Sequence, residues 1–161
     1  GTLAALQAKL QAGLAAKIAT VNADSPDDHA VETPQSDDIV IGVRADPTRW
    51  PWIALLPLSS GPDADLGHRV LWRHRVRVVG WLTDPDEGAL PLKLIRFQRA
   101  IRECLLKSRI PSVTADSTAG YQLRHIRDEY SPVFQENHPD AGDFSQMCAS
   151  VFEVQQQQDV A

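Results

Sequence analysis

One segment constrains the fold of this chain more than any other. From His68 to Leu82, apolar and basic side chains alternate, which is typical of a β-strand whose two faces meet different surroundings. One face would carry mainly apolar residues: Val70, Trp72, His74, Val76, Val78 and Leu82. The other face would carry Arg69, Leu71, Arg73, Arg75, Arg77, Val79 and Trp81. Strands commonly have about five or six residues, so we expect this one to extend past the body of its sheet as half of a hairpin.

Three residues of this strand carry further predictions. Gly80 interrupts the pattern, which indicates a bulge or the close approach of another part of the chain. Trp72, on the apolar face, should belong to the core. Trp81 shares the arginine-bearing face, where it fits either the core or a protein interface.

Two helices are predicted by apolar residues at spacings of three and four. The first covers about residues 3–21, with Thr2 available as N-cap, and its apolar stripe is Leu3, Leu6, Leu10, Leu14, Ile18 and Val21. The second covers about residues 90–108, and Pro111 stops it. Its buried stripe would be Leu90, Leu94, Phe97, Ile101 and Leu105. Basic residues lie mostly on its other side: Lys93, Arg96, Arg99 and Arg102.

Shorter strands and their connections complete the pattern. Strands are predicted at residues 38–44, 52–58, 121–134 and 144–154, the last two as an antiparallel hairpin. Pro57 indicates an edge position or a bend. Loops are predicted at residues 22–38, 61–67, 111–119 and 136–143. The first of these is acidic and long, which fits a mobile tether, or a functional arm or lid.

These elements predict an α+β fold. It has a mostly antiparallel sheet with a long β-hairpin, an N-terminal helix and one central helix packed on the sheet. The 161 residues suit a single domain. We divide it into an N-terminal helix, an acidic linker, a core and a flexible tail, at residues 1–22, 23–37, 38–155 and 156–161.

Charge is distributed unevenly along the chain. The net charge is -5, yet residues 68–109 hold ten basic and four acidic groups, and the segments on both sides are acidic. The overall sign argues against broad coating of nucleic acid. The basic block could face nucleic acid, pair with acidic segments of the same subunit, or meet the acidic surface of a neighbouring copy.

The sequence offers no recognisable catalytic or metal-binding motif. Glycine-rich phosphate loops, nucleophile elbows and paired metal-ligand motifs are all missing from it. His68 and His74 would lie about 20 Å apart along one strand, too far to bind one metal ion. Cys104 and Cys148 are predicted as buried free thiols. We therefore expect no catalytic residue, no metal and no cofactor.

One polar group in the predicted strand 121–134 was weighed as an acid–base site. His125 and Glu129 would share a strand face, but Asp128 would not. Polar residues on a solvated strand face explain the group without catalysis. We also find no apolar run long enough to cross a bilayer and no secretion signal, so a membrane partner is not expected.

Several segments together carry a family resemblance. An Ala/Leu-rich helix and an acidic linker precede WIALLP, then WRHRVRVVGWLTD leads into a helix that begins with DPDE, and FSQMCASVFEV closes the chain. Over about residues 2–155, this order resembles the tail-terminator proteins of long-tailed bacteriophages, also called tail-completion or minor tail proteins.

The resemblance implies a structural role. Such subunits form a homohexameric ring on the finished tail tube, end its growth and present a surface to the head connector. The implied partners are further copies of the chain, the tail tube protein and head connector proteins, and DNA passes through without sequence-specific binding. The implied location is the tail or neck of the virion, after assembly in the host cytoplasm. No reaction is catalysed.

Within this hypothesis we assign residues to a subunit interface or a lumen-facing surface: Arg73, Arg75, Arg77, Trp81, Arg96 and Arg99. The acidic segments 24–38 and 136–143 would face a neighbour. Two alternatives remain open, a head–tail connector or neck protein, and a small enzyme or ligand-binding domain with convergent polar groups. A deep apolar pocket with a perturbed titratable group would favour the last.

Overall fold

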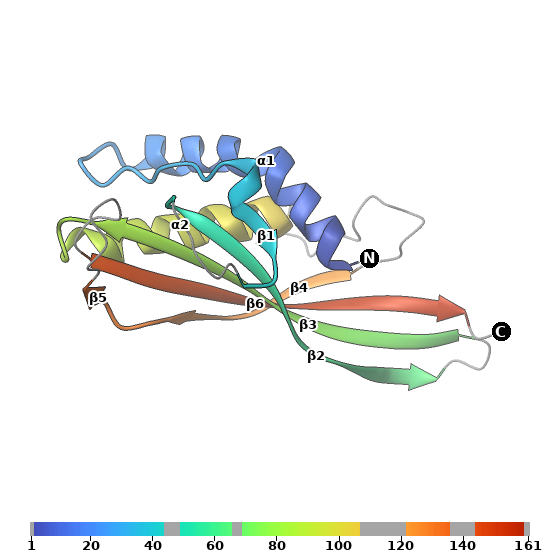
Figure 1. Cartoon of the computed structure of the whole chain (residues 1–161). Coiled ribbons are helices and arrows are strands. Elements are labelled where there is room, and N and C mark those ends of the chain that lie inside the picture. The colour runs from blue at the N-terminus through green and yellow to red at the C-terminus, as the bar shows by residue number, and fades with distance from the viewer. Residues whose placement is uncertain (1, 44–48, 66–68, 107–121, 136–143, 160–161) are drawn as a thin grey trace.

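The computed structural model describes residues 2–43, 49–65, 69–106, 122–135 and 144–159 (Figure 1). Helices α1 (Thr2–Asp24) and α2 (Ala89–Leu106) cover one face of a sheet, and a 3-10 turn, η1 (Ser36–Asp38), precedes the first strand. The strands are β1 (Ile39–Ile41), β2 (Trp52–Asp65), β3 (Arg69–Asp84), β4 (Gln122–Tyr130), β5 (Phe134–Gln135) and β6 (Phe144–Asp159). The α+β prediction is confirmed.

The sheet has the order β1-β2-β3-β6-β4, and β5 pairs with the beginning of β6. Only β1 and β2 run parallel, and the other neighbours are antiparallel. The two predicted helices and the antiparallel pairing of β4 with β6 are confirmed. The predicted strand 121–134 is divided, however, because Pro132 has no N–H group to continue the ladder.

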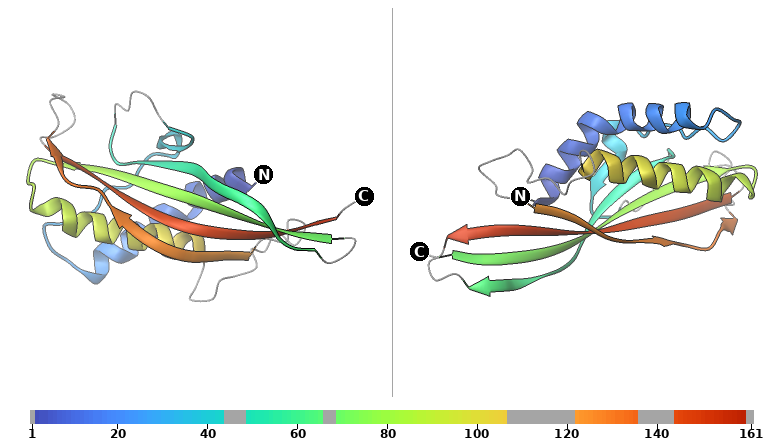
Figure 2. Two further views of the ribbon diagram at one scale, coloured as in Figure 1. Left: turned by 90° about the horizontal axis from the view of Figure 1, so that it is seen from below. Right: turned by 180° about the vertical axis from the view of Figure 1, so that it is seen from behind.

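A three-stranded extension is the most distinctive part of the shape. Strands β2, β3 and β6 continue together well beyond the helices (Figures 1 and 2), down to the pair Arg69 with Asp159. The predicted long hairpin is therefore confirmed. Two neighbouring predictions were wrong, because both segments add hydrogen bonds to β3: residues 61–65 belong to β2 rather than to a loop, and residues 156–159 belong to β6 rather than to a flexible tail.

Proline shapes the β2 side of this extension. The register of β2 on β3 shifts between Pro57 and Ser59, and again between Pro62 and Ala64. Proline cannot donate to a ladder, so it is tolerated at bulges and on edges. Beyond its short pairing with β1, β2 has no second neighbour among the described strands. The bend expected at Pro57 is thus present.

The core lies between the helices and the sheet face beneath them. All five predicted stripe residues of α2 are buried, and so are Leu6, Leu10, Leu14, Ile18 and Val21 of α1. They pack on sheet residues that include Ile53, Leu55, Val76, Val78 and Phe152. Trp72, expected in the core, is only half-buried. Its strand position lies in the extension, where no helix covers it (Figure 1).

The connection after α1 is packed against the domain. Asn22 donates to the carbonyl of Val31 and accepts from its N–H group, both at 2.9 Å. Val31 and Pro34 are buried, and Arg96 of α2 donates to the carbonyl of His29. The prediction of a mobile tether is therefore wrong for these residues, because buried side chains and backbone hydrogen bonds hold the segment in place.

Gly80 is a place where α2 and the sheet approach each other closely. A Cβ atom at this position would lie 2.6 Å from Cε1 of Phe97 and 3.1 Å from Sγ of Cys148. Phe97 is fully buried, so its ring has little room to withdraw. The predicted close approach at Gly80 is confirmed, and the missing side chain lets Phe97 of α2 pack directly on β3.

We expect Gly80→Ala to destabilise the protein by about 1–3 kcal/mol, because the added methyl overlaps the Phe97 ring. Urea denaturation would measure the loss. Gly61→Ala is the matched control, since a Cβ there meets nothing within 4 Å. Combining Gly80→Ala with Phe97→Leu should cost less than the sum of the single changes. Additive costs, or equal effects at Gly80 and Gly61, would contradict this account.

Candidate protein–protein interface

The sheet face that the helices leave uncovered carries a shallow apolar cavity. Residues from neighbouring strands line it, because the strand register places them side by side: Trp52, Ala54 and Leu56 of β2, Val79 and Trp81 of β3, and Met147 and Ala149 of β6. Val43, Arg77, Glu129, Tyr130 and Ser131 form its margins, and Cys148 also contributes. The volume is about 370 Å³. We call this cavity the tryptophan pocket.

Two tryptophans form one wall of the tryptophan pocket. Trp52 and Trp81 are directly paired across β2 and β3, and their rings stack with centroids 5.3 Å apart. Trp52 is only 2% exposed, whereas Trp81 is partly exposed. Neither indole N–H has a hydrogen-bond partner among the described residues. Stacked aromatic rings beside unpaired donors are typical of surfaces that bind another protein.

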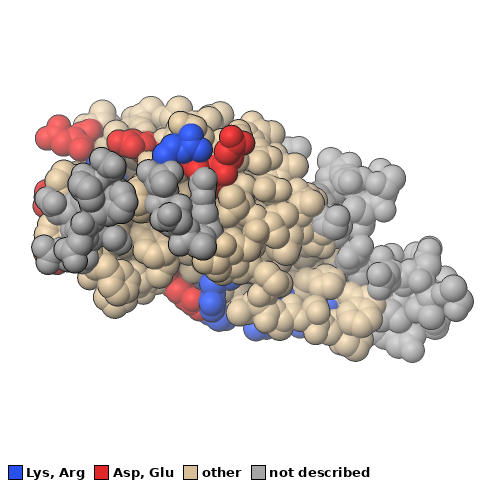
Figure 3. Space-filling view, in the orientation of Figure 1, with Lys and Arg blue, Asp and Glu red and all other residues tan. Residues whose placement is uncertain are grey.

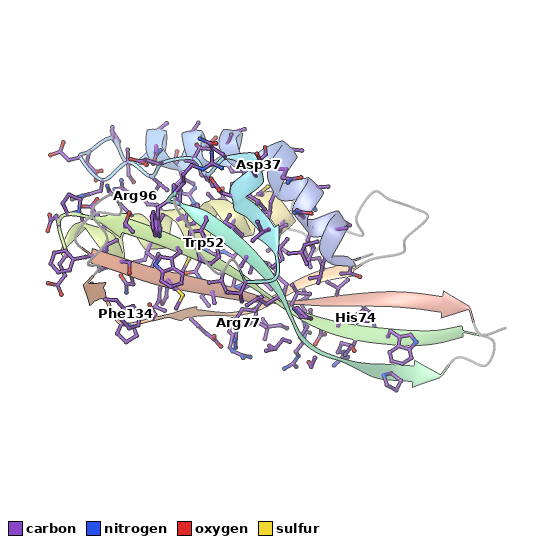
Figure 4. The ribbon with its side chains drawn as sticks, in the orientation of Figure 1. Asp37, Trp52, His74, Arg77, Arg96 and Phe134 are labelled. Atoms are coloured by element: carbon purple, nitrogen blue, oxygen red, sulfur yellow. The ribbon has the colours of Figure 1, made fainter. Side chains whose placement is uncertain are left out.

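Arginines continue this face into the sheet extension. Arg73, Arg75 and Arg77 occupy alternate positions of β3, and Figure 4 shows Arg77 on the side of the sheet away from the helices. The carboxylate of Glu153 lies between two of them, with Arg73 Nε at 3.3 Å and Arg75 Nε at 3.4 Å. Arg124 Nη2 approaches the same carboxylate at 3.7 Å. Glu153 is 6% exposed, so its charge is compensated by three arginines at once.

A second carboxylate, that of Glu129, pairs with the other arginines of this face. Glu129 accepts from Arg127 Nε at 2.8 Å and lies 3.5 Å from Arg77 Nη2. The hydrogen bond from Arg127, aided by the charge of Arg77, holds the pKa of the Glu129 carboxyl below its ordinary value. Five arginines thus share two carboxylates, which leaves this face positive. We call Arg73, Arg75, Arg77, Arg124 and Arg127 the arginine cluster.

The arginines of α2 lie in a different place. Arg96 binds both carboxylate oxygens of Asp27, and Arg99 binds Asp24 at 2.8 Å and Glu103 at 2.8 Å. The contact with Arg96 holds the pKa of the Asp27 carboxyl well below its usual range. Figure 4 shows Arg96 in the helical layer, across the sheet from Arg77.

The interface residues expected from sequence therefore form two groups. Arg73, Arg75, Arg77 and Trp81 gather on the uncovered sheet face, whereas Arg96 and Arg99 are engaged in ion pairs within the helical layer. In the acidic segment 24–38, Asp38 is also paired, with Arg49 Nε at 3.1 Å. The second acidic segment, 136–143, lies outside the described residues. Figure 3 shows acidic side chains along the helical side and basic ones beneath the strands.

The polar group on β4 has a geometry that the sequence did not predict. A register irregularity between His125 and Arg127 rotates the chain, so that His125 Nε2 lies 2.7 Å from Asp128 Oδ1. The expectation that these two residues lie on different faces was wrong. Ser150 Oγ also donates to Asp128 Oδ1, at 2.9 Å, and Arg102 Nη1 donates to Oδ2, at 2.6 Å. Ser150 and Arg102 both donate to the carboxylate of Asp128, so this arrangement joins α2 to the sheet. It does not align Ser150 with His125 as a nucleophile with its base.

A larger hollow lies beside the connection that follows α1, and its two buried carboxylates, Asp38 and Asp84, are paired. It measures about 730 Å³ and includes Asp38, Arg49, Asp84 and Lys93. Burial alone would raise the pKa of Asp84, but hydrogen bonds from Lys93 and the backbone N–H of Asp86 outweigh it and lower the pKa. Asp38 and Asp84 thus have basic partners in Arg49 and Lys93.

Metal and thiol chemistry find little support. The two cysteines are free and buried, as predicted, and burial raises the pKa of Cys148 to about 12. Such a thiol is not nucleophilic at neutral pH. Within the described ranges, no three His, Cys, Asp or Glu side chains come together as a metal site. No helix in the described part of the chain is long and apolar enough to cross a membrane.

The fold and this face define a two-layer α+β domain with one sheet face left for contact. No protein-family model matches the sequence, and no curated protein matches it significantly. Among solved structures, a chain of the "Virion of native gene transfer agent (GTA) particle" has a similar fold. The likeness covers 92% of this chain and 95% of that chain, with a TM-score of 0.50 and 11% sequence identity. The two chains thus share an architecture over nearly their whole lengths.

Sequence reasoning missed the partner of Trp81. Trp52 was assigned to a strand without a role, and that strand was not predicted to pair with the strand that carries Trp81. Aligning both strands around the turn would have paired them, but the extra residues at the β2 bulges hide the register. The pocket itself depends on which sheet face the helices cover, and alternation along the strands does not determine that.

We expect Glu153→Gln to lower the stability of the fold by about 1–3 kcal/mol, because it leaves three neighbouring arginines without their shared buried carboxylate. Chemical denaturation at low salt would measure it. Glu129→Gln is the control and should cost less, since that side chain is 37% exposed and better solvated. Equal losses at both positions would contradict the special role of Glu153.

Proposed function

We propose that this chain is a structural virion protein of a phage-like particle, and that it closes the end of the tail tube as a ring. The observation that carries the proposal is the near full-length likeness to a chain of a gene transfer agent virion. The coverage matters most, because the likeness extends over nearly the whole of both chains. The sequence resemblance to tail terminators supports the finer assignment.

The charge distribution supports assembly into a ring. The arginine cluster lies on the uncovered face of the sheet. On the helical side, Asp28, Glu32 and Asp37 are exposed and form no ion pair among the described residues. Two different surfaces of opposite character suit a head-to-tail contact, and such contacts close into a ring when the rotation allows. An isologous contact through the uncovered sheet face would instead bring two arginine clusters together.

In this role the protein catalyses nothing. The ring, as a hexamer, ends tube growth and offers a surface to head connector proteins, and DNA passes through its opening without sequence-specific contacts. The paired carboxylates and the inert buried thiols support a non-enzymatic role. The protein would be located in the tail or neck of the particle, after assembly in the host cytoplasm.

Native mass spectrometry at low and high salt tests the ring. We expect a discrete closed oligomer of about six copies, weakened by salt because charged contacts across the interface are screened. A strict monomer, in solution and on purified tail tubes, would contradict the proposal. Rings that bind connector proteins but leave tube length unchanged would favour the head–tail connector alternative.

A separate variant tests whether the arginines of β3 contribute to the ring interface. Arg73→Gln, Arg75→Gln and Arg77→Gln combined should weaken the ring by roughly tenfold or more, through the loss of complementary charge. Glutamine is preferred to glutamate, which would repel Glu153 and Glu129 within the subunit. Lys17→Gln, on α1, is the control for removing charge elsewhere. A ring that persists unchanged in the triple variant would remove the arginines from the interface.

A further inference from the structure

The tryptophan pocket lacks acceptors for its own donors. The indole N–H groups of Trp52 and Trp81 and the Nε–H group of Arg77 are buried, and none has a hydrogen-bond partner among the described residues. Buried donors normally find an acceptor, and leaving one unpaired costs free energy. The pocket therefore suits an occupant with apolar side chains and acidic or carbonyl oxygens beside them.

The helical layer presents a surface of that kind. Leu92 and Ile95 lie three residues apart on α2 and are 47% and 56% exposed. They are the two large hydrophobic side chains of the described helices that are exposed to this extent. Asp86 and Glu87, just before the helix, are exposed and form no ion pair among the described residues. We call Leu92 and Ile95 with these two acids the helix knob.

The other exposed hydrophobic side chains do not offer an equivalent surface. Val43 and Tyr130 form the margin of the pocket itself. Phe134 points away from the helices, on the pocket side of the sheet (Figure 4). Ile41 on β1 and Leu58 in the β2 extension stand singly. Within the described ranges, the helix knob alone combines neighbouring exposed apolar side chains with carboxylates that form no ion pair.

Charge and placement both favour a contact between two copies. The pocket adjoins the arginine cluster, whereas the knob carries acids, so a knob-to-pocket contact pairs opposite charges. The knob belongs to the layer on one face of the sheet and the pocket opens on the other (Figures 1 and 4). One subunit cannot fill its own pocket, but a second copy can, with its own pocket left for a third.

We propose that the helix knob of one subunit docks in the tryptophan pocket of the next, and that this head-to-tail contact is the repeating interface of the ring. The inference rests on the proposed ring function and names the surfaces that build it. An amphipathic helix seated in an apolar groove is an established mode of recognition. The acids of the knob would accept from the indole and arginine donors that the pocket leaves unpaired.

Two variants block the helix knob and the tryptophan pocket separately. Ile95→Lys places a cation on the knob, and Ala149→Arg fills the floor of the pocket with a side chain that can still reach solvent, since Ala149 is partly exposed. Ala15→Lys, exposed on α1, and Ser60→Arg, exposed in the β2 extension, are the matched controls. Leu92→Lys and Met147→Arg replace the first pair if circular dichroism shows that either variant fails to fold.

The decisive experiment mixes the blocked variants and weighs the products by native mass spectrometry. Each variant alone should be monomeric, with association weakened by roughly tenfold or more, while both controls form the wild-type ring. A 1:1 mixture should give a dimer and nothing larger, because one intact knob and one intact pocket remain between the two variants.

Other results would overturn the inference in recognisable ways. Rings that survive either variant would show that the interface lies elsewhere and leave the ring function standing. A dimer formed by one variant alone would indicate an isologous contact, and a mixture that stays monomeric would refute the pairing of knob and pocket. A wild-type protein that is monomeric at about 1 mM and also on purified tail tubes would overturn both the inference and the proposed ring.

Discussion

The pairing of β3 along its full length holds the molecule together. Hydrogen bonds join β3 to β2 on one side and to β6 on the other, from the covered body of the sheet to the end of the extension. The body could fold with shorter strands, but the extension has no helix to cover it and depends on this continuous ladder. Because the pairing of β3 with β6 runs from Arg69 to Asp84 without a register shift, the body and the extension of the sheet share one continuous strand pair.

Different interactions stabilise the two faces of β3. Under the helices, Val76, Val78 and Leu82 are buried by apolar packing, and the approach of Phe97 to Gly80 fixes the distance between the layers. On the other face, arginines and two carboxylates substitute for a second layer. Their long aliphatic stems shield neighbouring apolar residues such as Val151, which is fully buried although no helix covers it. This sheet face is therefore stable although no second layer covers it, and it stays accessible to a partner.

Much of this could be predicted from the sequence because each signal was local. Periodicity located both helices and their buried stripes, and alternation located β3 and its faces. The errors arose where tertiary contacts override local patterns. The Gln run reads as a tail, yet it pairs with β3. Residues 22–38 read as a mobile connection, yet hydrogen bonds of Asn22 with Val31 and of Arg96 with His29 hold this segment on the domain. The bulge that joins His125 to Asp128 has no sequence marker at all. Of the candidate site, Arg73, Arg75 and Arg77 could be named from the alternation along β3. Arg124, Arg127 and the pocket could not, because they depend on the strand order and on which sheet face the helices cover.

The prolines of the β2 extension have a consequence for the free chain. An unpaired strand edge exposes backbone donors and acceptors to any other extended chain, and this is a common route to aggregation. Pro57 and Pro62 each remove a donor, and the irregular register beside them bends the strand away from a flat template. The prolines thus disfavour the addition of strands between free copies of this chain, and they leave its side-chain surfaces as the places where another protein can be recognised.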